Sequence, residues 1–143
     1  MNKKFGVLLI SVLLVVVTVG CGFLWFGNLD GMSFEGEYDT YLGDTHWTQV
    51  NFETKTTGTM SYKYFFNHIG IGQELRDDET WSFTYEYSFD DDTGTISRPG
   101  ERTINFETRN SPPNLEIVLQ NWPSNGNNSV LTTVDDADEN DEE

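Results

Sequence analysis

The stretch WSFTYEYSF, residues 81–89, decides the fold of this 143-residue chain. Aromatic side chains occupy its alternate positions, and serine, threonine or glutamate fills every position between them. Side chains of a β-strand point alternately to the two faces of a sheet, so this pattern predicts a strand with one buried face. The buried face would consist of Trp81, Phe83, Tyr85, Tyr87 and Phe89.

The same period of two recurs on both sides of this stretch. We expect further strands in SFEGEY (33–38), WTQVNFE (47–53), TGTMSYKYFF (57–66), GTIS (94–97), RTINFET (102–108), NLEIVLQ (114–120) and SVLTTV (129–134). No segment after residue 28 has the periodicity of a core helix. Eight consecutive strands joined by tight turns predict an all-β antiparallel meander that closes into a small barrel.

Two kinds of connection are expected between these strands. Most are short: ETKTTGT (53–59) and FDDDTGT (89–95) predict hairpins with Gly58 and Gly94 at a left-handed or bulge position. The exception is NHIGIGQELRDDE, residues 67–79, which lacks the alternation of a strand. Loops of this length are usually functional or mobile. We expect a thirteen-residue loop there, placed over one mouth of the barrel as a lid.

The first 27 residues carry the features of an export segment. The basic start MNKK precedes sixteen uncharged residues, and Cys21, the only cysteine, follows them. This is the layout of a secretory signal peptide over residues 1–20, and the residues before the cysteine resemble the bacterial lipobox, whose cysteine is acylated. The apolar run continues to Phe26, so a membrane-spanning anchor over residues 5–26 is the alternative. Both interpretations place the rest of the chain on the exported side of the cell envelope, anchored to a membrane.

Composition sets the remaining boundaries. Residues 21–32 would be a tether, residues 33–134 the β-domain, and residues 135–143 an acidic tail too poor in apolar side chains to fold. All 24 acidic residues but only six basic ones follow residue 27. A domain this acidic repels polyanions and lacks the basic footprint that nucleic-acid binding needs. One cysteine makes no intramolecular disulfide, so the core alone must hold the domain together.

No arrangement of residues in the sequence specifies a reaction. Residues 92–94 spell the Asp-Thr-Gly triplet of aspartic proteases, but acidic residues precede it and a hairpin turn explains it. The three aspartates at 90–92 lack the spacing of a calcium loop. His46 and His68 show no zinc-ligand spacing. We therefore expect a protein that is not an enzyme and needs no metal or other cofactor.

Hydroxyl-bearing aromatic residues are common on two of the predicted strands. Buried tyrosines need hydrogen-bond partners, whereas a solid core would more naturally use aliphatic side chains. Two interpretations follow: ordinary core packing, or the lining of a partly polar ligand cavity inside the barrel. The candidate cavity residues are Tyr62, Tyr64, Trp81, Tyr85 and Tyr87.

The chain resembles the lipocalin-like domains found in many small bacterial lipoproteins. FEGEY (34–38) is similar to the opening of such domains, with Tyr38 in the aromatic place. WTQVNFETKTTGTMSY (47–62) is similar to their tryptophan strand, polar turn and Gly-Thr return strand, and FTYEYSFDDDTGTIS (83–97) repeats that hairpin. The resemblance covers roughly residues 33–134. It implies a small meander barrel and no shared catalytic residues.

Two functions are compatible with these features. The first is a cell-envelope lipoprotein that binds a small hydrophobic or amphipathic ligand in its barrel. The alternative is a non-enzymatic structural or interaction lipoprotein, with a solid barrel core and an acidic surface for a basic envelope partner. In both cases the chain would attach to the membrane through the lipid or the anchor helix, and it would not bind nucleic acid.

Overall fold

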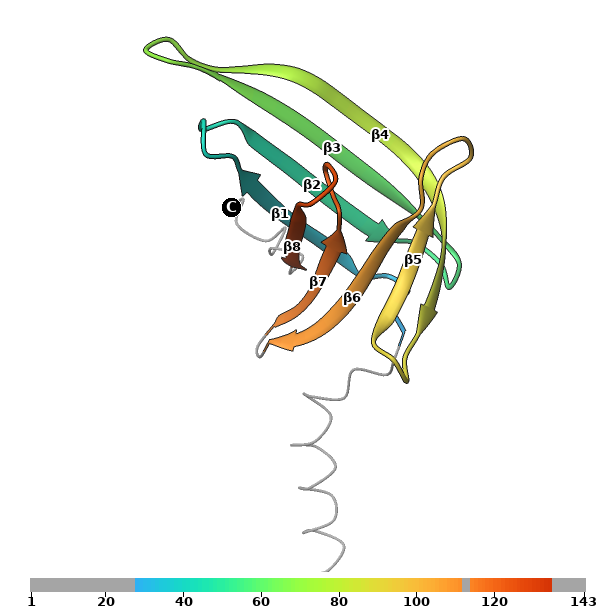
Figure 1. Cartoon of the computed structure of the whole chain (residues 1–143). Helices are drawn as coiled ribbons and strands as arrows, with labels where there is room; N and C mark the ends of the chain where they lie inside the picture. The colour runs from blue at the N-terminus through green and yellow to red at the C-terminus, as the bar shows by residue number, and fades with distance from the viewer. Residues whose placement is uncertain (1–27, 112–113, 135–143) are drawn as a thin grey trace, which may run out of the picture.

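The structure is a computed structural model that describes residues 28–111 and 114–134. Eight antiparallel strands follow one another in chain order, and the last pairs with the first to close a barrel (Figure 1). The strands are β1 (Ser33–Asp39), β2 (Thr45–Phe52), β3 (Thr57–His68), β4 (Gly72–Ser88), β5 (Thr93–Ser97), β6 (Ile104–Ser111), β7 (Asn114–Gln120) and β8 (Asn128–Thr133). The predicted eight-stranded meander barrel is therefore confirmed.

Several features predicted from the sequence belong to segments that the structure does not describe. The signal peptide or anchor helix, Cys21 and the acidic tail lie outside the described residues. Among the residues that are described, no helix is both long and apolar enough to cross a membrane.

The barrel has two ends, which we call the base and the mouth. The base end carries the β2–β3, β4–β5 and β6–β7 connections, and the mouth end carries the other four. Residues 28–32 lie at the base, where the Gly31 N–H donates to the Phe52 carbonyl at 2.7 Å. The Phe52 N–H in turn donates to the carbonyl of Met32 at 2.9 Å, and Leu29 is 1% exposed in the core. This part of the expected tether therefore packs into the barrel.

The interior of the base half is solid. The ring centroid of Phe52 lies 5.8 Å from that of Phe34, 4.7 Å from Tyr85 and 5.8 Å from Phe106. Edge-on and tilted contacts of this kind are the favoured geometries of aromatic pairs. Aliphatic side chains fill the remaining space, each at most 1% exposed: Met60, Ile96, Ile117, Leu119 and Leu131. Burial of one large apolar side chain contributes about 1.5–3 kcal/mol, so this cluster is the main source of stability.

The stretch that predicted the fold forms the second half of β4. Phe83 and Tyr85 are 3% and 4% exposed, as the alternation predicted. Trp81 and Tyr87 lie on the same face but are only partly buried. Phe89 is 52% exposed, so its assignment to the buried face was wrong. Strand β4 ends one residue earlier, and the following turn carries the Phe89 ring out of the interior.

Gly58 and Gly94 have a different role from the predicted one. Both lie inside strands, and neither has the left-handed backbone expected of a turn glycine. A Cβ at Gly94 would lie 2.4 Å from the Phe106 ring, and a Cβ at Gly58 would lie 2.6 Å from the Phe83 ring. Because each glycine lacks a Cβ, the aromatic ring of its partner on the neighbouring strand can lie directly over it. The left-handed position of the β4–β5 turn belongs to Asp92, with φ 55°.

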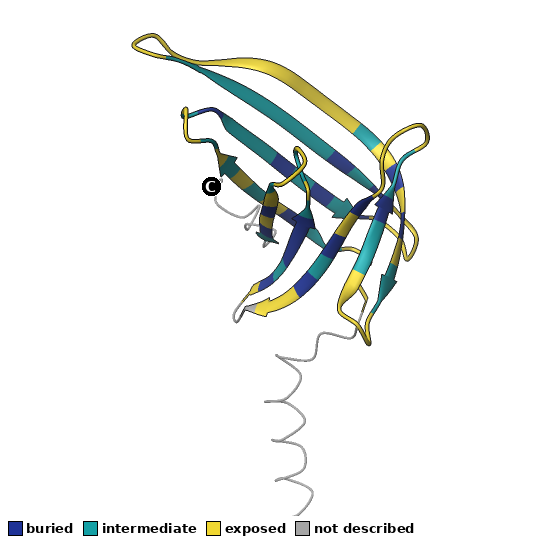
Figure 2. Ribbon diagram, in the orientation of Figure 1, coloured by how far each residue is buried: buried dark blue, intermediate teal, exposed yellow. Residues whose placement is uncertain are grey.

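The loop predicted over residues 67–79 was also wrong. Strand β3 continues to His68 and β4 begins at Gly72, so a tight turn joins two long strands. This hairpin extends beyond the rest of the mouth end, and residues 69–80 are exposed (Figures 1 and 2). Alternation in a sequence records the burial of one face of a strand. Because neither face is buried here, the sequence lacks the pattern although the backbone is a strand.

Candidate functional site at the barrel mouth

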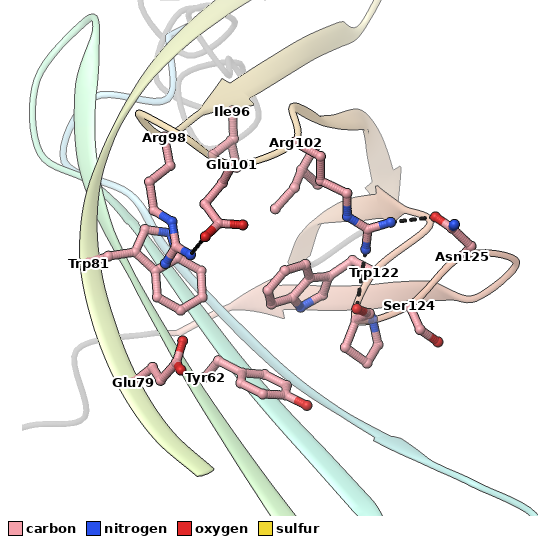
Figure 3. Close-up of a pocket in the computed structure, with 12 residues that line it drawn as sticks. Tyr62, Glu79, Trp81, Ile96, Arg98, Glu101, Arg102, Trp122, Ser124 and Asn125 are labelled. Carbon is pink, nitrogen blue, oxygen red and sulfur yellow. Dashed lines mark hydrogen bonds and ion pairs between the residues drawn. The ribbon is translucent and has the colours of Figure 1, made fainter.

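A pocket of about 460 Å³ opens at the mouth end of the barrel (Figure 3). It exists because β5 pairs with β4 only from Thr84 to Ser88, while β4 continues past it towards the mouth. Small-molecule sites commonly have volumes of about 300–1,000 Å³. The lining residues are Tyr62, Glu79, Trp81, Ile96, Arg98, Glu101, Arg102, Ile104, Trp122, Pro123, Ser124 and Asn125.

Two indole rings form the apolar centre of the pocket. Trp81 comes from β4 and Trp122 from the β7–β8 connection, and their ring centroids are 5.8 Å apart at an interplanar angle of 60°. The Trp122 indole N–H donates to Oγ1 of Thr48 at 3.0 Å, and Thr48 is buried. The Tyr62 ring meets Trp122 edge-on, with centroids 5.4 Å apart. The three rings thus form a partly buried aromatic surface, supplied by three separate segments.

Charged side chains border this aromatic surface. The Arg98 guanidinium lies 4.3 Å from the centre of the Trp81 ring and forms a 2.8 Å ion pair with Glu101 (Figure 3). Glu79 and Arg102 complete two charges of each sign in the lining. Solvent-accessible ion pairs contribute only about 0–1 kcal/mol, so a polar ligand group can replace them at little cost. The rim therefore offers both donors and acceptors around an apolar centre.

Arg102 fixes the loop that carries Trp122. Its guanidinium donates to the backbone carbonyls of Asn121 and Pro123, at 2.5 and 3.2 Å, and to Oδ1 of Asn125 at 2.5 Å. Hydrogen bonds from a charged donor contribute about 1.5–3 kcal/mol in favourable surroundings and less when exposed to solvent. The bond to Thr48 holds the indole itself. Trp122 is therefore held in place at both its backbone and its side chain.

Further aromatic groups extend the surface from Tyr62 along the inner face of the mouth. The Tyr62 hydroxyl lies 2.6 Å from Nδ1 of His46. Burial raises the pKa of Tyr62 to about 12, with further contributions from nearby negative charges such as that of Asp77. Burial also lowers the pKa of His46 below its ordinary value, against the attraction of Asp44. At neutral pH the pair is therefore an uncharged phenol bonded to an uncharged imidazole.

Of the five predicted cavity residues, the structure brings Tyr62 and Trp81 together in this pocket. Tyr64 lies farther along β3, where its ring stacks on His46 with centroids 4.7 Å apart. Its hydroxyl donates to Oδ2 of Asp44 at 3.0 Å. Tyr64 therefore extends the inner aromatic face but lies outside the pocket lining.

The other two predicted cavity residues lie in the base half. The Tyr85 hydroxyl donates to the Thr54 carbonyl at 2.7 Å, and its ring belongs to the core cluster. The Tyr87 ring stacks on Phe106 with centroids 5.9 Å apart, and its hydroxyl lies 2.7 Å from Oγ1 of Thr108. Both phenols thus have hydrogen-bond partners within the protein, and the partly buried Tyr87 also borders, with Phe106, a second hollow of about 500 Å³.

The pocket residues that sequence reasoning missed include Arg98, Arg102 and Trp122. Arg98 and Trp122 lie in segments whose proline, glycine and asparagine content indicates loops, and Arg102 is the first residue of the predicted strand 102–108. One signal was available, because a single tryptophan in the otherwise polar loop NWPSNGNN (121–128) must find an apolar partner. No comparable signal marked the two arginines, whose role depends on a contact between distant segments.

The two histidines have protein partners of other kinds. His46 contacts Tyr62, and Nε2 of His68 lies 2.5 Å from Oε2 of Glu74. Within residues 28–111 and 114–134, no three histidine, cysteine or acidic side chains gather in a way that suits a metal ion.

No protein-family model matches the chain, and searches of curated proteins and of solved structures also find no match. The fold is consistent with the lipocalin-like domains that the sequence resembles, because it is a closed antiparallel barrel of eight strands. The residues and the geometry define a β-barrel with a solid aromatic base and an aromatic pocket at its mouth.

Proposed function

We propose that the protein is a membrane-tethered binding module of the cell envelope that holds a small amphipathic molecule in the mouth pocket. The observation that carries this proposal is the pair of partly buried indoles, Trp81 and Trp122, inside a pocket of about 460 Å³. An apolar group placed against both rings would lose its contact with water. The polar end of the same molecule would meet Arg98 and Glu101 at the rim.

The incomplete burial of the two indoles favours a ligand over ordinary packing. In the base half, rings such as Phe83 are covered almost completely by their neighbours. Trp81 instead borders the pocket, and so leaves apolar surface that a bound molecule would cover. Each Å² of apolar surface removed from water contributes about 25 cal/mol, which makes this surface a favourable place for an apolar group.

The position of the tether supports the same function. Residues 28–32 pack at the base end, whereas the pocket opens at the mouth end. A lipid on Cys21, or alternatively an anchor helix over residues 5–26, would leave the pocket on the side away from the attachment point. Metabolic labelling with a radioactive fatty acid tests the tether, since Cys21→Ala should lose the label. Equal labelling of the variant would exclude acylation at this residue.

Titration with N-phenyl-1-naphthylamine, an apolar dye that fluoresces out of water, tests the pocket. The chain from residue 28 onwards should bind the dye saturably at one site. Trp122→Ala should weaken binding roughly tenfold, because large aromatic side chains dominate binding energies. Trp47→Ala is the matched control, since Trp47 does not line the pocket and contacts Lys63 instead. Unsaturable binding, or an equal loss in both variants, would overturn the proposed function.

A further inference from the structure

The mouth half of β4 has a hydrogen-bonding partner on one side only. Residues 72–75 and 77–83 pair with β3, with a register shift at Arg76, but β5 begins to pair with β4 only at Thr84. No strand in the described part of the chain pairs with the other side of residues 72–83. An unpaired strand edge presents a row of backbone N–H and C=O groups that can accept another strand.

The pairing of β3 and β4 determines which backbone groups face this open edge. The Tyr85 N–H donates to the Thr56 carbonyl at 2.8 Å, so the backbone groups of Tyr85 point towards β3. In an antiparallel ladder this direction alternates from residue to residue, and the register between residues 77 and 84 has no shift. The residues whose backbone groups point to the open edge are therefore Asp78, Thr80 and Ser82.

The edge is long and uncovered. All nine residues from Gly72 to Thr80 are exposed, along the outer margin of the hairpin (Figure 2). The nearest connection, between β5 and β6, contacts β4 at Trp81 through Arg98. A typical strand has about five or six residues, so this margin is long enough for a complete additional strand.

The charges on this margin indicate the kind of strand that fits. Four of the nine residues are acidic and one is basic: Glu74, Arg76, Asp77, Asp78 and Glu79. Like charges on directly opposed strands destabilise pairing, so a second copy of this edge is a poor partner. A strand rich in lysine or arginine would instead be attracted to the same positions, most strongly at low salt.

We propose that the open edge of β4 binds an extended basic peptide segment of a partner protein, which adds a strand beside residues 72–80. Peptide recognition by strand addition takes its affinity from main-chain hydrogen bonds and its specificity from the side chains. Here the acidic side chains would select basic residues. This surface adjoins the mouth pocket, whose lining includes Glu79, but it uses the backbone around Thr80 and not the indole of Trp122.

The test measures binding of the fluorescently labelled peptide KTKTKTK to the full chain in a neutral detergent. Thr80→Pro removes one edge N–H, and edge positions of this kind tolerate proline. It should weaken peptide binding about tenfold, whereas Thr80→Ala should change it less than about twofold. The same peptide with a methyl group on every backbone nitrogen keeps its charge, loses its donors, and should bind at least about tenfold more weakly. Trp122→Ala should leave peptide binding unchanged, which separates this surface from the pocket.

Three results would overturn the proposal. Equal binding of the methylated peptide would show that charge alone attracts it, a conclusion that does not depend on how well Thr80→Pro folds. Equal binding by a folded Thr80→Pro variant would place the peptide elsewhere. Dimers in sedimentation that disappear in Thr80→Pro would make a second copy of the chain the occupant.

Discussion

The base and mouth halves of the barrel share the same alternation of aromatic and polar residues on β4, but they differ in how completely neighbouring groups cover the aromatic side chains. On β4, Phe83 is 3% exposed and packs beside Phe52, whereas Trp81, two residues earlier on the same face, borders a pocket. The difference lies in what packs against each ring. Phe83 packs against the rings of Phe52 and Tyr85 in the base cluster. Trp81 lies farther from the last β4–β5 pair, Thr84 with Ser97, and meets the Trp122 ring and the Arg98 guanidinium, which come from two connections. An identical alternation can therefore produce a solid core in one half and a pocket lined by partly buried rings in the other.

Among the changes that test this difference between the two halves, truncation of a core ring should have the largest effect, and that effect should be a loss of stability. Phe83→Ala should lower the free energy of unfolding by about 3–5 kcal/mol, because it removes buried apolar surface and leaves a cavity. Tyr41→Ala is the control, since Tyr41 is fully exposed and its loss should change stability by less than about 0.5 kcal/mol. Urea denaturation measures both values. Similar losses in the two variants would mean that the base half is not the packed half.

The glycine beneath Phe106 provides a second test of close packing at the base. Gly94→Ala would place a Cβ 2.4 Å from the ring, so the free energy of unfolding should fall by about 1–3 kcal/mol. Phe106→Leu should relieve part of this loss when the two changes are combined. A double-mutant cycle measures the coupling. Simple additivity of the two losses would contradict the proposed contact.

Loosening the Trp122 loop should affect the mouth and spare the base. Arg102→Gln removes hydrogen bonds to three loop residues, so dye affinity should fall about three- to tenfold, equivalent to roughly 1 kcal/mol. Arg109→Gln is the control, because Arg109 lies on β6 towards the base and pairs with Glu107. If both variants bind the dye like the native protein, Arg102 does not position Trp122.

The smallest effect should come from the uncharged pair of His46 and Tyr62. The folded-state pKa of His46 lies below 6.5, so the unfolded chain binds its proton at a higher pH than the folded chain. Its contribution to stability is therefore present above pH 6.5 and is lost as the pH falls from 6.5 towards the folded-state pKa. Between about pH 7.5 and 5.5, the native protein should lose more stability than His46→Gln. Identical pH profiles in chemical denaturation would refute this assignment.

The sequence predicted the fold wherever one face of a strand is buried. The alternation around Phe83, and that around Ile117 on β7, arises from packing against the core, so it could be read without a structure. It failed for the β3–β4 hairpin beyond the mouth, because the two strands there hydrogen-bond to each other while the β4 side chains stay exposed on both faces and those of β3 are only partly covered. Hydrogen bonding between two backbones does not by itself require polar and apolar residues to alternate in the sequence.

For a related reason, the sequence indicated only some of the residues that line the pocket. Tyr62 and Trp81 lie on strands with a clear alternation, and the many hydroxyl-bearing aromatic residues on those strands indicated a site. Trp122 and Arg102 reach the same place from connections, through contacts with segments that are far away along the chain. Such contacts depend on where the barrel wall ends, which local patterns do not encode.

The most direct test of the central claim follows the indole N–H signals by nuclear magnetic resonance. The chain from residue 28 onwards contains three tryptophans: Trp47 away from the pocket, and Trp81 and Trp122 within it. During titration with N-phenyl-1-naphthylamine, the signals of Trp81 and Trp122 should move together and saturate with one dissociation constant, while that of Trp47 stays in place. If all three signals move alike, or none moves at saturating dye, the mouth of this barrel is not a binding site.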